Sequence, residues 1–294
     1  MDRITLSHDR LTFSAMGCGL ASNEAAPLVV LLHGFPDSPH TFREQLPALA
    51  EAGFRAIAPT MRGYEPSSQP DDGDYRITTM ARDVLAWLDS LGEQRVHLVG
   101  HDWGAAVTYA AGAMAPERFH SLTTLAVPHA VHSRRVFWRL PSQLLRFWYM
   151  HFFQLRGLAE WAVEREDWAL LRRLIRSWSP GFRMDDDHWA HLRAQFEGEG
   201  VKAAMLAYYR QNVSPGQFLG LRPSEAMTLK TVPVRTLAIA GHQDGCMDSR
   251  LFDHLFFDED FPQGIRIEFI PDAGHFLHLE RPDVVNQLLL DWIG

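Results

Sequence analysis

The chain has 294 residues, 46% of them hydrophobic and 22% charged, with a formal net charge of −8 at pH 7. This length suits one large domain or a core with an inserted subdomain, and the apolar content argues against a disordered chain. The acidic balance argues against nucleic acid and anionic membranes as partners.

The cysteines and the amino-terminal segment bear on the cellular compartment. The two cysteines, Cys18 and Cys246, imply no disulfide framework. Residues 1–10 carry charges and no apolar run, unlike a signal peptide. No stretch of the chain approaches the ~20 apolar residues of a membrane span. We therefore expect a cytoplasmic protein.

Strand and helix patterns alternate through the first part of the chain. Residues 3–19 are typical of two short strands around a turn. Continuous apolar runs that predict buried strands lie at 27–32, 54–59, 95–99 and 121–128, with helical patterns at 77–92 and 103–119. This alternation predicts an α/β fold with a parallel sheet and covering helices.

The strand pattern stops at Pro128. From about Ala130 to Leu219 the sequence favours helices rich in aromatic and arginine side chains, with no convincing buried strand. Strand patterns return at 232–241 and 265–274, and a helical pattern closes the chain at 283–293. We therefore predict a core in two parts, 1–129 and 230–294, with a helical cap inserted at 130–229.

A sharp strand-to-helix turn is predicted around Asp102. Gly100 and Gly104 flank it at the two positions where a side chain would collide with the strand and the helix. A carboxylate, whose ordinary pKa is ~3.9, is ionised at neutral pH and can displace a leaving group from saturated carbon. The product is an alkyl ester, which an activated water can hydrolyse. The alternative is an aspartate that only caps the helix.

Hydrolysis of such an ester needs a base and oxyanion donors. His275 follows the last predicted strand and Asp244 follows the one before it, so the chain order is nucleophile, acid, base. The backbone N–H groups of Trp103 and Phe35 are placed to form an oxyanion hole. His101 and His278 are interpreted as packing residues.

Six stretches of the chain together resemble the soluble, bacterial-type epoxide hydrolases of the α/β-hydrolase superfamily. They are 33–70, 100–105, 147–154, 208–212, 241–245 and 274–282. The resemblance implies a mostly parallel eight-stranded sheet with helices on both faces and a helical cap after the sixth strand. It also implies an epoxide as substrate and no cofactor. We expect that epoxide to be small and apolar, no metal because the chain has no metal-binding motif, and a monomer or homodimer.

The resemblance further implies two cap tyrosines that hydrogen-bond the epoxide oxygen. Tyr149 and Tyr209 match those positions, and Tyr208 is the neighbour that could be confused with Tyr209. Phenol groups can stabilise a developing alkoxide while staying protonated at pH 7. Substrate contacts are expected from the two tyrosines and from Phe35, Trp103, Trp148 and Phe152, although aromatic clusters of this kind are often ordinary core.

The principal alternative is a haloalkane dehalogenase with the same aspartate nucleophile. Phe35 stands where that family often has an asparagine that binds halide, but the Trp103 indole could serve a halide. A fluoroacetate dehalogenase is disfavoured because Trp103 and Ala106 stand where that family has arginines. A non-catalytic binding protein on the same fold would not need the water-activating pair.

Overall fold

The computed structural model describes residues 1–21, 25–132, 139–213 and 224–294. Eight strands form one sheet in the order β1-β2-β4-β3-β5-β6-β7-β8. They are β1 Asp2–His8, β2 Leu11–Cys18, β3 Leu28–Leu32, β4 Arg55–Pro59, β5 Val96–His101, β6 Phe119–Leu125, β7 Thr236–Gly241 and β8 Ile265–Ile270. Strand β2 pairs antiparallel with β1 and β4, and the other pairs are parallel. The predicted α/β-hydrolase architecture with a mostly parallel sheet is confirmed.

The central strands are buried on both faces, as their continuous apolar runs predicted. Every residue of β3, β5 and β7 is buried. Helices α1 (Gln45–Glu51) and α13 (Pro282–Ile293) pack on one face of the sheet. Helices α2 (Ile77–Ser90) and α3 (Trp103–Met114) pack on the other. Two further short helices, α11 (Phe252–Leu255) and α12 (Leu277–Glu280), follow β7 and β8.

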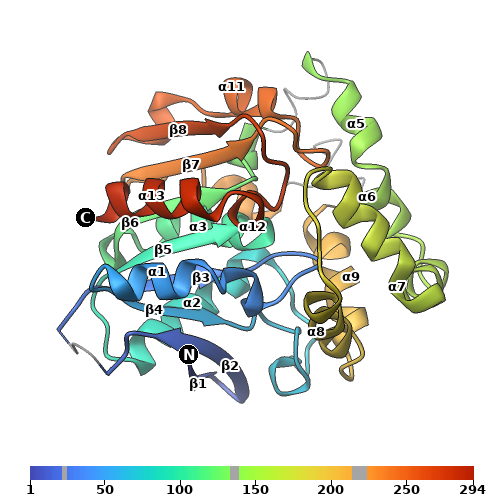
Figure 1. The fold of residues 1–294 in the computed structure, drawn as a ribbon, viewed down its shortest axis with the longest axis horizontal. Helices are drawn as coiled ribbons and strands as arrows, with labels where there is room; N and C mark the ends of the chain where they lie inside the picture. The colour runs from blue at the N-terminus through green and yellow to red at the C-terminus, as the bar shows by residue number, and fades with distance from the viewer. Residues whose placement is uncertain (22–24, 133–138, 214–223) are drawn as a thin grey trace.

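The helices between β6 and β7 gather beside one end of the sheet (Figure 1). They are α5 Ser142–Arg146, α6 Trp148–Phe152, α7 Leu158–Trp178, α8 Asp186–Phe196 and α9 Val201–Asn212. Within the described part of this segment there is no strand. Leu219, the expected end of the strand-free stretch, lies outside the described residues, so the exact cap boundaries stay a prediction.

Helix α7 is not continuous. Arg165 has an extended conformation, and Glu166, Asp167 and Trp168 have positive φ angles, so the chain turns sharply inside the span. Its second half therefore runs in its own direction and ends at Trp178, whose backbone contacts the loops that follow β7 and β8. Among the described residues, no helix is both long and apolar enough to cross a lipid bilayer.

Candidate active site

The turn between β5 and α3 places Asp102 at the carboxyl end of the sheet. Its backbone has φ 52° and ψ −117°, a conformation that is costly for a residue with a side chain. A Cβ at Gly104 would lie 2.1 Å from the Leu32 carbonyl oxygen, and one at Gly100 would lie 2.2 Å from the Gly104 carbonyl oxygen. Both glycines are therefore required by close backbone approach, as the sequence pattern indicated.

The two carboxylate oxygens of Asp102 have different partners. The Phe35 backbone N–H donates to Oδ1 at 2.7 Å, and His275 Nε2 lies 3.4 Å from Oδ2. The peptide bond between Phe35 and Pro36 is cis. Burial alone would raise the pKa of Asp102, but His275 and the Phe35 amide lower it below its usual value. The side chain is thus an anion with Oδ1 already bound by an amide.

Asp244 and His275 form the pair that the chain order predicted. His275 Nδ1 lies 2.8 Å from Asp244 Oδ2, while Asp244 Oδ1 accepts hydrogen bonds from the Cys246 and Met247 amides at 2.7 and 2.8 Å. Burial lowers the pKa of His275, but Asp244 and Asp102 on its two sides raise it to about 10. The imidazole therefore carries a proton between two carboxylates in the free protein.

The end of α7 binds both loops that carry this pair. The Trp178 carbonyl oxygen accepts hydrogen bonds from the Gly245 and His275 amides, each at 3.0 Å. A Cβ at Gly245 would lie 1.9 Å from the Ser177 carbonyl oxygen, so only glycine permits this approach. Sequence analysis did not identify Trp178. Its contacts are made by the backbone carbonyl, which every residue type has, so the residue type does not indicate them.

The two cap tyrosines share a cavity with Asp102. Tyr149 in α6 and Tyr209 in α9 are both buried, with ring centroids 5.6 Å apart, and both line the same cavity as Asp102. Burial raises the pKa of each hydroxyl well above its usual value, so both are hydrogen-bond donors at neutral pH. Tyr208 donates instead to the Arg62 carbonyl at 2.6 Å and does not line the cavity.

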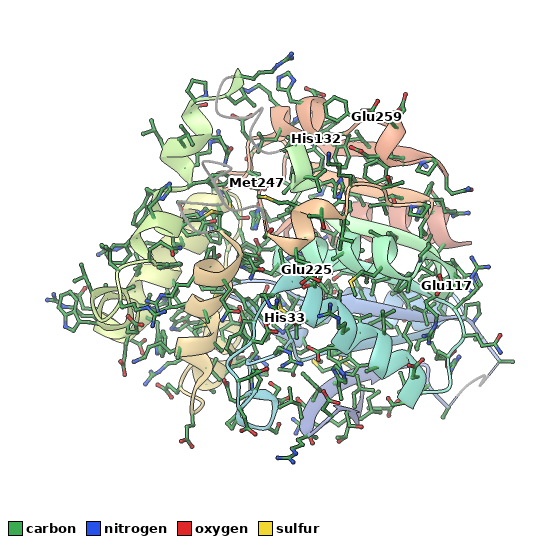
Figure 2. The ribbon with its side chains drawn as sticks, turned by 180° about the vertical axis from the view of Figure 1, so that it is seen from behind. His33, Glu117, His132, Glu225, Met247 and Glu259 are labelled. Atoms are coloured by element: carbon green, nitrogen blue, oxygen red, sulfur yellow. The ribbon has the colours of Figure 1, made fainter. Side chains whose placement is uncertain are left out.

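A cavity of about 180 Å³ opens above Asp102 and is lined almost entirely by apolar side chains. The lining includes Phe147, Met150, Leu255 and Met247. Met247, in the loop after β7, is labelled in Figure 2. Such a cavity suits a small apolar molecule, with Asp102 and the tyrosines as its polar groups.

Three residues expected to contact the substrate do not line the cavity. Trp148 is 49% exposed and does not line the cavity, and neither does Phe152. Helical periodicity explains this, because Tyr149 in α6 and Phe153 at its C-terminal cap are buried on one side, which leaves positions 148 and 152 on another face. Phe35 is fully buried beneath Tyr209, with ring centroids 5.1 Å apart, and is also absent from the lining. Trp103 does line the cavity.

Two groups of side chains in the described residues have atoms close enough to share a metal ion. Asp244, Cys246 and His275 form the first group, but the hydrogen bond between Asp244 and His275 already uses two of its atoms. The second comprises Asp37, His101 and His278, all three buried.

Comparisons with known proteins agree with this geometry. The family described as alpha/beta hydrolase fold matches residues 27–282. An AB hydrolase superfamily protein, YfhM of Bacillus subtilis, is 30% identical over 93% of this chain and 92% of its own length. Epoxide hydrolase A of Mycobacterium tuberculosis is 29% identical over the same shares. A solved epoxide hydrolase from an endophytic Streptomyces superposes with a TM-score of 0.78 at 27% identity, over 99% of this chain and 94% of that one.

Proposed function

The chain belongs to the α/β-hydrolase family, and from this premise we propose that it is an epoxide hydrolase that converts a small apolar epoxide and water to a vicinal diol. One observation carries the proposal: a buried carboxylate, Asp102, lies between a histidine–aspartate pair and two tyrosines in one apolar cavity. The names of the relatives support the same reaction. No cofactor takes part in it.

In the first step, Asp102 opens the epoxide ring. Oδ1 is bound by the Phe35 amide, so Oδ2 attacks the epoxide carbon from the side opposite the C–O bond that breaks. Tyr149 and Tyr209 donate hydrogen bonds to the epoxide oxygen, on which negative charge develops. The products are an Asp102 alkyl ester and a neighbouring hydroxyl group.

Forming the ester changes the protonation of His275. Ester formation removes the negative charge of Asp102, so one of the two carboxylates that raise the pKa of His275 is lost. The His275 imidazolium then releases one proton, and the alkoxide formed by ring opening takes up one proton. The number of protons in the site is therefore unchanged. His275 becomes a neutral base only after the ester has formed.

In the second step, neutral His275 removes a proton from water, which attacks the ester carbonyl carbon of Asp102. The oxyanion forms at Oδ1, where the Phe35 amide already donates, and the Trp103 amide at the first turn of α3 is the second donor. The diol leaves with the second proton of the water. Asp102 is again a carboxylate and His275 again an imidazolium.

A second candidate function is haloalkane dehalogenation. The Trp103 side chain lies in the cavity wall beside Tyr209, and its indole N–H could donate a hydrogen bond to a departing halide. Incubation with styrene oxide and, separately, with 1-bromobutane distinguishes the two. We expect diol from the first and no bromide from the second, whereas bromide without diol would overturn the proposal in favour of the dehalogenase.

The double substitution Tyr149→Phe with Tyr209→Phe is expected to lower the rate of ring opening by ~10⁴-fold, because no donor then meets the developing alkoxide. Formation of the covalent ester with styrene oxide, followed by mass spectrometry after rapid quenching, measures this step. Tyr208→Phe is the matched control, since that hydroxyl bonds the Arg62 carbonyl outside the cavity, and it should still form ester. Full activity in the double variant would refute the assignment.

The proton on His275 gives a pH-dependent signature. Its pKa in the folded protein, about 10, is raised above the ordinary 6.5, so its ion pairs stabilise the fold fully below pH 6.5. The contribution of these ion pairs to the free energy of unfolding is lost as the pH rises from 6.5 towards 10. We expect Asp102→Asn to lower the midpoint of the His275 titration, followed by NMR of the imidazole, while Asp253→Asn leaves it unchanged. An unchanged midpoint in Asp102→Asn would contradict the proposal that loss of the Asp102 charge lowers the pKa of His275.

We also propose a cytoplasmic location, which the two unpaired cysteines support. A monomer or homodimer stays a prediction.

A further inference from the structure

Three cap side chains spaced three residues apart contact the loop that carries Asp244. Gln143 Nε2 donates to the Cys246 carbonyl at 2.7 Å, and Gln143 Oε1 accepts from the Asp248 amide at 2.9 Å. Arg146 donates to the Asp244 carbonyl at 2.5 Å. The Tyr149 hydroxyl lies 3.4 Å from Cys246 Sγ. This loop is therefore bound to the cap segment that carries the first tyrosine.

Cys246 is fixed at both backbone groups. Its amide donates to Asp244 Oδ1 at 2.7 Å, and its carbonyl accepts from Gln143. The side chain is 1% exposed and lines the same cavity as Tyr149 and Asp102. Its sulfur thus stands at a defined place between the acid of the catalytic pair and the cap tyrosine.

The hydrogen bond between Cys246 and Tyr149 can run in either direction, because each group carries a proton. Burial raises the pKa of the Cys246 thiol well above its usual value, so the sulfur keeps its proton. A thiol is both a weak donor and a weak acceptor, and a phenol hydroxyl can donate one proton while it accepts another. If Tyr149 donated to the sulfur, its proton would be turned away from an epoxide above Asp102. If the sulfur donates to Tyr149, that proton is left for the epoxide oxygen.

We propose that Cys246 is a positioning residue for ring opening, whose S–H donates to the Tyr149 oxygen and keeps the Tyr149 hydroxyl proton directed at the substrate. The inference rests on the proposed function. It assigns no contact with the reacting atoms to the thiol, which acts only through Tyr149. A purely packing role for Cys246 would require its size and shape but not its proton.

Two variants separate these roles. Cys246→Val keeps an apolar side chain of similar size and removes the donor, whereas Cys246→Ser keeps a donor of smaller size. We expect Cys246→Val to slow formation of the Asp102 ester about tenfold, with hydrolysis of the ester unchanged, and Cys246→Ser to stay within about threefold of wild type. Rapid quenching with styrene oxide and mass spectrometry follows both steps, and Cys18→Val is the matched control.

Combining Cys246→Val with Tyr149→Phe tests whether the effect of the thiol on ester formation depends on the Tyr149 hydroxyl. In the Tyr149→Phe background, Cys246→Val should slow ester formation by no more than about twofold, because the hydroxyl that the thiol orients is gone. A tenfold effect that persists in this background would overturn the inference, as would a Cys246→Ser variant as slow as Cys246→Val. Wild-type protein that forms neither ester nor diol would instead overturn the proposed function and this inference with it.

Discussion

Replacing Asp102 by alanine is expected to abolish turnover of styrene oxide, with a loss of at least ~10⁴-fold in kcat. The reason is that no other carboxylate lines the cavity, as far as the described residues go, so no ester can form. The variant should also show no mass increase after incubation with substrate. Removal of this side chain also takes one ion-pair partner from His275, so circular dichroism and thermal unfolding should show that the variant is folded.

Asp253→Ala is the matched control for that experiment. Asp253 is an exposed aspartate in α11, and its removal should leave turnover unchanged. Diol formation by Asp102→Ala at more than a few per cent of the wild-type rate would mean that water attacks the epoxide directly. The covalent mechanism would then be wrong, although the reaction could stand.

His275→Gln is expected to separate the two half-reactions. Ring opening depends on Asp102 and the tyrosines, so the ester should still form, while its hydrolysis should slow by ~10³-fold or more without a base. The intact protein should therefore gain the mass of one substrate molecule, and peptide mapping should place the added mass on Asp102. Diol release should stop after one turnover.

The control for this variant is His242→Gln, which changes an exposed histidine in the loop after β7. It should release diol at the wild-type rate and accumulate no adduct. A His275→Gln protein that forms neither ester nor diol would indicate that His275 is needed for ring opening itself. The assignment of His275 as the water-activating base would then fail.

Much of the core could be predicted from the sequence because its signals are local. Strands buried on both faces need continuous apolar runs, and these mark β3, β4, β5 and β6 directly. The turn at Asp102 also has a local cause, since Gly100 and Gly104 must be small where two backbones meet. Chain order was then enough to relate Asp244 and His275 to the nucleophile.

The substrate contacts were harder to predict because they depend on how each cap helix is rotated. Four aromatic residues adjoin Tyr149, and the sequence alone does not tell which face of α6 points inward. The structure shows that Trp148 and Phe152 do not line the cavity, whereas Phe147 does. Gln143 contacts Cys246, which lies about a hundred positions away in the chain, and Trp178 makes its contacts through a backbone carbonyl. Sequence patterns indicate neither kind of contact.

The hydrogen bonds from the Gly245 and His275 amides to the Trp178 carbonyl have a mechanical consequence. A rigid lifting of this end of the cap would break both bonds and pull apart the loops that align acid and base. Entry of substrate and exit of diol by a route that leaves the end of α7 in place would keep both bonds. The end of α7 therefore helps to fix the positions of the loops that carry Asp244 and His275, the proposed acid and base.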